Sequence, residues 1–275
     1  TSPRDARLRA FATREMRVQR ALRDRFSSVD RLYGSGTVER LSRARVAVVG
    51  VGGVGSWAAE ALARSGVGAL ALFDADEVCL GNSNRQSHAL TPRVGQPKVE
   101  VVAGRLREIN PLLEVEPVQS FVTARNLREL VTARFDLVLD ACDAFRTKVD
   151  LIVHCKRNKI AMVVSGAAGG RTDPTQIRVR DLSKTSVDVL LAQVRRKLRD
   201  EFGWTRNPKR NFGVPAVYSL EAAQYPQPDG SVCDRRPVDG EAGLKLDCGD
   251  GLGAAMHVTA SFGMVAVARA LQKLL

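Results

Sequence analysis

The sequence predicts an α/β protein with a doubly wound, mostly parallel, Rossmann-like sheet and an antiparallel C-terminal extension. Two observations indicate the parallel sheet. Short apolar runs rich in β-branched residues alternate with helix-forming segments over about 120 residues, as in chains of β-α-β units. A glycine-rich turn joins the first of these runs to the first helix, which is typical of nucleotide-binding sheets. A less regular C-terminal part follows.

The first expected strand, 45–50, is the apolar run RVAVVG, and its composition fits a strand buried on both faces. The segment SWAAEALAR, 56–64, is a good helix former, and the run ALALF after it predicts a second strand at 69–73. The same reasoning predicts, in order, a helix at 99–109, strands at 114–118 and 135–140, a helix near 147–157 and a strand at 161–165.

Beyond residue 170 the pattern changes. Polar and apolar residues alternate over 176–182 as in a half-exposed strand, and 184–202 carries apolar residues on one helical face. A loop rich in Gly, Pro and Asp is expected at 225–253, and an apolar helix at 254–275. We therefore expect a basic N-terminal arm (1–41) and one α/β domain (42–275), with a nucleotide-binding half to about residue 170 and a substrate and dimer half after it.

Composition and charge exclude several classes of protein. The 275 residues are 44% hydrophobic and 26% charged, which excludes a disordered chain, a fibrous repeat and a polytopic membrane protein. The net charge of +12 predicts attraction to a polyanion such as nucleic acid. The five cysteines form no C-x-x-C pair, so neither a disulfide scaffold nor a four-thiolate zinc site is expected, and a cytoplasmic location is the default.

The C-terminal apolar stretch does not predict an integral membrane span. It extends over only about 15 residues, whereas crossing a bilayer takes roughly 20. Its small residues favour close packing in a core or a dimer, and peripheral contact with a membrane stays open.

The strongest local motif is the turn that follows the first strand. Its glycines allow a tight turn and let backbone N–H groups approach a phosphate at the positive end of the next helix. Asp74 ends the second strand about 20 residues after the last glycine, where an acidic side chain binds ribose hydroxyls. The sequence therefore predicts a nucleotide site with the glycines Gly50, Gly52, Gly53 and Gly55.

Three further residues favour a triphosphate over a dinucleotide. Arg85 and Lys98 would neutralise the larger charge of a triphosphate. Asp143 follows a later strand, where a carboxylate would repel bare phosphate but could hold Mg²⁺ that bridges phosphate oxygens. A nicotinamide-dependent oxidoreductase is an alternative that uses the same glycine turn, but it leaves these three residues without a role.

The order of these motifs resembles the ubiquitin-activating-enzyme-like superfamily, which includes the adenylyltransferases of thiamine and molybdopterin biosynthesis. The resemblance covers roughly residues 25–170, in G-x-G-G-x-G, D-x-D, N-x-N-R-Q, the Lys98 region and D-x-x-D. It extends further to one branch, the tRNA threonylcarbamoyladenosine dehydratases. Segments that carry this second resemblance are 25–34, 157–160, 165–170, 173–177, 181–185, 217–221, 225–227 and 251–255.

The resemblance implies a role for each matching residue. The four glycines would pass under the α-phosphate of ATP, Asp74 would hold the ribose, and Asp143 would hold Mg²⁺. An arginine from the neighbouring subunit of a homodimer would reach the phosphates, with Arg31 as the first candidate and Arg25 as the second. The residues that would grip or support the nucleotide are Asp76, Asn82, Asn84, Arg85, Gln86 and Lys98.

The resemblance also implies the reaction, ATP-dependent adenylation of a carboxylate. The expected substrate is threonylcarbamoyladenosine in the tRNA anticodon loop, whose activated carboxylate then cyclises with net loss of water. One alternative is adenylation of a small sulfur-carrier protein's C-terminus, which the missing zinc pairs disfavour; another is a non-catalytic RNA-binding module. A sulfur-relay partner and a role for Cys233 stay open.

A tRNA substrate would account for a basic cluster with interleaved aromatic residues. The aromatic residues Trp204 and Phe212 could stack on bases while neighbouring cations bind phosphates. The alternative is an ordinary solvated helix face with a core tryptophan. Candidate tRNA-binding residues are Arg195, Arg196, Arg199, Arg206, Lys209 and Arg210.

Overall fold

A computed structural model describes residues 18, 20–227, 229–235 and 252–275. Its centre is a seven-stranded sheet in the order β3-β2-β1-β4-β5-β7-β6. Every neighbouring pair is parallel except β6 and β7, which are antiparallel. The strands are β1 (Arg45–Val49), β2 (Ala69–Phe73), β3 (Glu114–Val118), β4 (Leu137–Asp140), β5 (Ala161–Ser165), β6 (Ile177–Asp181) and β7 (Pro215–Ser219).

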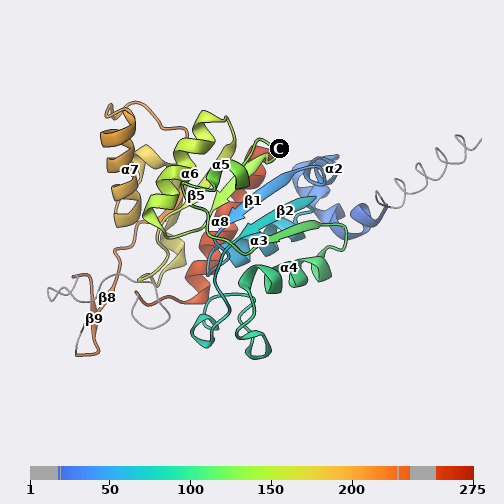
Figure 1. The fold of residues 1–275 in the computed structure, drawn as a ribbon, viewed down its shortest axis with the longest axis horizontal. Helices are drawn as coiled ribbons and strands as arrows, with labels where there is room; N and C mark the ends of the chain where they lie inside the picture. Colours follow the sequence, from blue (N-terminus) through green and yellow to red (C-terminus); the bar gives the residue numbers. More distant parts are fainter. Residues whose placement is uncertain (1–17, 19, 228, 236–251) are drawn as a thin grey trace, which may run out of the picture.

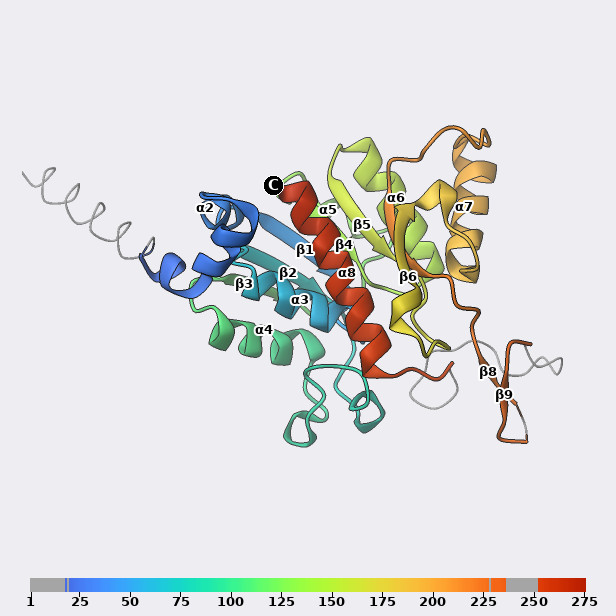
Figure 2. The ribbon, with the colours of Figure 1, turned by 180° about the vertical axis from the view of Figure 1, so that it is seen from behind.

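Helices cover both faces of this sheet, so the predicted fold class is confirmed (Figure 1). One face carries α3 (Gly55–Arg64), α4 (Lys98–Ile109) and α8 (Met256–Leu274), and α8 runs diagonally across the strands beside α3 (Figure 2). The other face carries α5 (Leu127–Leu130), α6 (Phe145–Arg157) and α7 (Val189–Phe202). Two hydrophobic clusters result, one on each face of the sheet.

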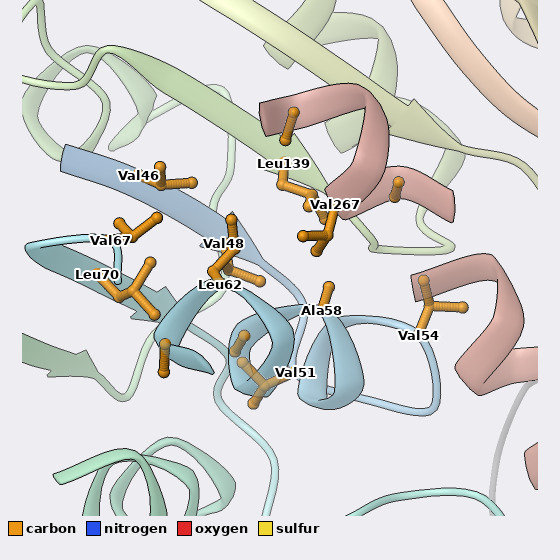
Figure 3. Packing of buried hydrophobic residues seen from close by; sticks show 14 of the residues in the cluster. Val46, Val48, Val51, Val54, Ala58, Leu62, Val67, Leu70, Leu139 and Val267 are labelled. Carbon is orange, nitrogen blue, oxygen red and sulfur yellow. The ribbon is translucent and has the colours of Figure 1, made fainter. Parts of the chain in front are cut away.

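The strand sequences explain their positions. The inner strands β1, β2 and β4 are almost completely buried, as expected for parallel strands covered on both faces. The edge strand β3 alternates between exposed and half-buried residues and contains Pro117, which an edge strand tolerates because it lacks one neighbour. Valines and leucines of β1 and β2 pack against Ala58 and Leu62 of α3 and Val267 of α8 (Figure 3).

Close packing of α8 on α3 requires a residue without a side chain. A Cβ at Gly263 would lie 2.7 Å from the carbonyl oxygen of Val54 and 3.1 Å from the amide nitrogen of Ala58. Gly263, a small residue of the C-terminal helix, therefore allows close packing within the core of the chain. None of the helices within the described ranges has the length and hydrophobicity needed to span a bilayer.

The C-terminal half differs from the prediction in one strand. Pro215–Ser219 forms β7, which is buried along its length and lies between β5 and β6. It was missed because its five residues begin with a proline and follow an irregular stretch after α7. Two smaller differences follow. Helix α7 starts later than expected, at Val189, and the side chain of Asp188 caps it by accepting from the amide of Leu191. A short hairpin of β8 (Tyr225–Pro226) and β9 (Val232–Cys233) lies within the expected loop.

The N-terminal arm is helical where it is described. Residues 20–33 form a helix, and α2 (Thr37–Leu41) follows it. Leu22, Phe26 and Val38 form a small hydrophobic cluster, and the Phe26 ring contacts Gly66, which lies between α3 and the start of β2. The arm therefore packs near the amino-terminal ends of the strands.

Candidate active site

The glycine turn lies at the carboxyl end of β1, where the strand order reverses between β1 and β4. Ligands of open α/β sheets bind at such a point. Gly50 has a φ of 83°, and a Cβ there would meet the backbone of Ala141 and Cys142 at 3.0–3.1 Å. A Cβ at Gly55, the first residue of α3, would lie 1.8 Å from the carbonyl oxygen of Gly50. The backbone of the turn therefore fits only glycine at these two positions, and the N-terminus of α3 faces the edge of the sheet.

Asp74 at the end of β2 is linked to this turn by hydrogen bonds. Its Oδ2 accepts from the amide of Val51 at 2.9 Å, and its Oδ1 accepts from the amide of Asp76 at 3.0 Å. Burial raises the pKa of Asp74, against the opposing effect of these two hydrogen bonds. The carboxylate thus fixes the turn and still lies where a ribose would be recognised.

The segment after β2 places Arg85 and Gln86 beside the turn. The Arg85 side chain runs along Gly53, with its Cγ 3.3 Å from the position of a Cβ there, and its backbone oxygen accepts from Trp57 Nε1 at 3.0 Å. Its guanidinium donates to the carbonyl of Gly81 at 2.9 Å and to Asn84 Oδ1 at 3.0 Å. Gln86 is buried, and its Oε1 has no partner among the described residues.

Lys98 begins α4 and is buried beside the same site. Its Nζ donates to Asp76 Oδ2 at 2.7 Å, and Asp76 is half exposed. Asn82 is buried and accepts from the amide of Cys79 at 3.3 Å. His88 is also buried, and burial, with a contribution from Lys98, lowers its pKa from 6.5 to about 4. The imidazole is therefore neutral near pH 7.

The carboxyl end of β4 carries an ion pair that the sequence analysis did not predict. Lys148 Nζ of α6 lies 2.6 Å from Asp140 Oδ2, and both side chains are completely buried. The other oxygen of Asp140 accepts from the amide of Cys142 at 3.2 Å and from its thiol at 3.0 Å. Asp143 follows and is exposed. The sequence signal for Lys148 was a lysine within an apolar helix face.

None of the cysteines in the described part of the chain carries a catalytic signature. Burial, with a contribution from Asp140, raises the pKa of Cys142 well above its usual value, so this thiol is packed rather than nucleophilic. Cys155 is buried too, and Cys233 is a free thiol on β9. Cys79 is disulfide-bonded, which the spacing of the cysteines did not predict.

The residues predicted to bind phosphates from a second subunit are remote from this site. Arg31 lies on the exposed helix of the arm and donates to Ser28 Oγ at 2.7 Å, while Arg25 donates to the carbonyl of Ile109 at 3.3 Å. This helix packs near the amino-terminal ends of the strands, whereas the glycine turn lies at the carboxyl ends. Neither arginine takes part in the nucleotide site of its own chain.

The predicted basic cluster is divided by the fold. Arg195 donates to Thr185 Oγ1, Arg199 lies over the Phe212 ring, and Arg206 pairs with Asp200. Trp204 and Phe212 meet edge to face at 4.8 Å, and Phe212 is buried in the core, so neither ring is fully open to a base. The exposed cations without a described ion pair are Arg196, Lys209 and Arg210.

Asp143 is an exposed carboxylate at this edge of the sheet and could hold a metal ion. The described ranges contain no group of three or more His, Cys, Asp or Glu side chains that could hold a metal ion. Asp74, Asp76 and Asp140 are engaged by backbone amides or lysines, whereas Asp143 is exposed. This arrangement fits Mg²⁺, which commonly uses one or two carboxylates together with substrate phosphates and water.

Comparison with known proteins identifies related sequences over nearly the whole chain. The model of the ThiF family matches residues 27–274. The tRNA threonylcarbamoyladenosine dehydratase of Escherichia coli K12 is 48% identical over 94% of this chain and 96% of its own length. The protein of the same name from Haemophilus influenzae is 43% identical over 91% of this chain and 93% of its own length.

Solved structures agree with the sequence comparison. The E. coli tRNA N6-threonylcarbamoyladenosine dehydratase in complex with ATP has a TM-score of 0.81 and 46% identity, covering 92% of this chain and 94% of its own. The same enzyme in complex with AMP has a TM-score of 0.80 and 47% identity, with the same coverage.

Proposed function

The chain belongs to the ThiF family and, within it, to the tRNA threonylcarbamoyladenosine dehydratases, and from this membership we propose how its own residues carry out an ATP-dependent dehydration of tRNA. The substrate is the adenosine that carries a threonylcarbamoyl group, and the product is its cyclic form. The observation that carries the proposal is the glycine turn at the carboxyl end of β1, with Arg85, Lys98 and Asp143 around it.

The reaction balances in two steps. A carboxylate oxygen of the threonyl group attacks the α-phosphorus of ATP, and pyrophosphate leaves. A nucleophilic atom of the carbamoyl group then attacks the acyl carbon of the mixed anhydride, loses its proton and expels AMP. One water is lost from the nucleoside and one ATP is converted to AMP and pyrophosphate, so no thiol and no sulfur-relay partner is required.

Positioning and positive charge supply most of the catalysis in this scheme. Backbone amides of the glycine turn and the N-terminus of α3 bind the α-phosphate, because orphan N–H groups and the helix dipole favour an anion there. Asp74 holds the ribose. Arg85 and Lys98 bind the phosphate chain, with Asn84 and Gln86 beside them, and one well-placed arginine is worth ~10³-fold or more in phosphoryl transfer.

Mg²⁺ is part of the proposal through Asp143. When bound, the ion would neutralise charge on the phosphate oxygens as pyrophosphate leaves. Asp140 is not proposed as a ligand because Lys148 and the amide of Cys142 already use its oxygens.

The proposed homodimer supplies the remaining cation from Arg31 of the second subunit, or from Arg25 if Arg31 is not used. Mixing variants tests this directly. Arg31→Ala and Asp143→Ala are each expected to be inactive alone, and a mixture of the two should recover activity, because the mixed dimer contains one site with Asp143 from one chain and Arg31 from the other. Failure of the mixture, with dimer exchange verified, contradicts a role in trans.

The adenylation step is tested by exchange of labelled pyrophosphate into ATP in the presence of the modified tRNA. Arg85→Ala and Asp143→Ala should lower the exchange rate by about 10³-fold while the thermal unfolding temperature stays unchanged, since Asp143 is exposed and Arg85 is only half buried. Exposed Arg196→Ala is the matched control for exchange at saturating tRNA. Exchange at wild-type rates in both site variants contradicts the assignment.

A further inference from the structure

Arg171 is a buried cation without an ion pair among the described residues. Its side chain belongs to the segment after β5, and the residue is only 4% exposed. One nitrogen, Nη1, donates to the carbonyl of Gly169 at 2.8 Å, and Nε has no partner. Burial lowers the pKa of Arg171, against the opposing effects of Asp188, Glu221 and Tyr225. An arginine stays charged in proteins, so the fold keeps an incompletely satisfied positive charge at this position.

The two carboxylates whose charge acts on Arg171 are already used by the backbone. Asp188 Oδ2 accepts from the amide of Ala167 and its Oδ1 from that of Leu191, both at 2.9 Å. Glu221 accepts from the backbone amides of Thr172 and Asp173 at 2.9–3.0 Å. These carboxylates therefore fasten the segment and cap α7, and the fork of donors on Arg171 is left for another anion.

The segment 166–173 is held rigidly between several elements. A Cβ at Gly166 would lie 2.2 Å from Asp188 Oδ2, so this glycine allows the carboxylate to approach the backbone. Gly170, with a φ of 71°, donates to the carbonyl of Gly253 at 2.6 Å. His257 Nε2 of α8 lies 3.0 Å from the carbonyl oxygen of Thr172. A guanidinium on this support is preorganised, which reduces the entropy lost when it binds an anion.

The same helix end connects Arg171 to the phosphate site. Thr259, in the first turn of α8, lies against Gly53, with 3.3 Å between its Cβ and the position of a Cβ on the glycine. Met256, the residue before His257, donates its backbone amide to the carbonyl oxygen of Asn84 at 3.1 Å. The glycine turn, the Arg85 segment and the Arg171 segment therefore meet at the N-terminus of α8, at the carboxyl edge of the sheet.

We propose that Arg171 binds the carboxylate of the substrate's threonyl group and holds the oxygen that does not attack the α-phosphorus. This inference rests on the proposed function. A carboxylate at the end of a nucleoside side chain can reach a side chain that is 4% exposed, whereas a phosphate of the RNA backbone is held at the surface. The planar guanidinium presents its N–H donors to a carboxylate oxygen in a fixed geometry, which the ammonium group of a lysine does not.

The test compares Arg171→Met, Arg171→Lys and the control Arg178→Met, which changes an exposed arginine of β6 that donates only to backbone carbonyls. Binding of tRNA with and without the threonylcarbamoyl group is measured for each, together with ATP affinity and thermal unfolding. Arg171→Met should keep its unfolding temperature or raise it, because a buried and poorly paired charge is removed. ATP affinity should change by less than about twofold in every variant.

The decisive quantity is the preference for modified over unmodified tRNA. We expect Arg171→Met to reduce this preference by about 10- to 100-fold, the range for a hydrogen-bonded charged group, while affinity for unmodified tRNA is retained. Arg171→Lys should recover part of the preference, and Arg178→Met all of it.

Three outcomes overturn the proposal. An unchanged preference in Arg171→Met shows that the carboxylate is bound elsewhere. Equal weakening for both tRNAs, with a salt dependence lower by about one unit, assigns Arg171 to an RNA phosphate instead. A large loss of stability in both Met and Lys variants assigns it to the structure of the segment. Failure of the proposed function is distinguishable, because wild-type protein would then form no dehydrated nucleoside from ATP and modified tRNA.

Discussion

Replacing Lys148 by methionine leaves a carboxylate buried without its cation. The Asp140–Lys148 pair is 2.6 Å long and completely buried, and the carboxylate raises the pKa of Lys148 although burial alone would lower it. Removing one partner of such a pair costs about 3–5 kcal/mol. For a chain of this size each kcal/mol corresponds to about 2–4 °C, so we expect the unfolding temperature to fall by roughly 10 °C.

The assay is thermal unfolding of wild-type protein, Lys148→Met and the double variant Asp140→Leu with Lys148→Met. The double variant should recover most of the lost stability, because no buried charge remains and the volumes are similar. It should still exchange pyrophosphate slowly, since Asp140, the last residue of β4, also accepts from the amide of Cys142, which directly precedes Asp143. Lys148→Met that unfolds within about 2 °C of wild type refutes the reasoning.

Four further results are expected. Gly55→Ala should lose nucleotide binding in a calorimetric titration, because its Cβ would lie 1.8 Å from the Gly50 carbonyl oxygen; wild-type ATP affinity would contradict this. Because the pKa of His88 is about 4 in the folded chain and near 6.5 when unfolded, stability should fall by about 3 kcal/mol as the pH drops from 6.5 to 4, and His88→Gln should flatten that fall in denaturant titrations. Neutralising the exposed cations Arg196, Lys209 and Arg210 together should reduce the salt dependence of tRNA binding by about two units, and an unchanged slope points to another surface. Cys233→Ser should dehydrate modified tRNA at the wild-type rate, and a large loss would require a thiol in the reaction.

The fold could be predicted from local pattern wherever strands and helices alternate. The inner strands are continuous apolar runs separated by helices, so periodicity and length identified them without knowledge of their neighbours. The prediction failed at β7, because a five-residue strand that starts at Pro215 and follows an irregular stretch after α7 has no local signature. Its place is decided by pairing with β5 and β6, which are distant in the sequence.

Some residues of the candidate site could be predicted from the sequence and others could not. The glycine turn, Asp74, Arg85, Lys98 and Asp143 could be proposed because each belongs to a motif with a known spacing from a strand end. Lys148 and Arg171 could not, because their significance lies in burial and in the partners they have or lack, and these appear only when the chain is folded.

The basic cluster shows the limit of charge patterns. Six cations in a short span suggested one phosphate-binding surface, yet tertiary contacts occupy three of them in an ion pair, a hydrogen bond and a ring contact. Sequence spacing on α7 predicted which side chains share a helix face. It did not predict that three of these arginines would contact Asp200, Thr185 and Phe212.

The most direct test of the central claim is mass analysis of tRNA nucleosides together with the nucleotides released from ATP. Incubation of the protein with ATP, Mg²⁺ and tRNA that carries threonylcarbamoyladenosine should give a nucleoside lighter by one water and one AMP for each such product. A nucleoside of unchanged mass, or ADP in place of AMP beside the lighter product, would contradict adenylation of the threonyl carboxylate at this site.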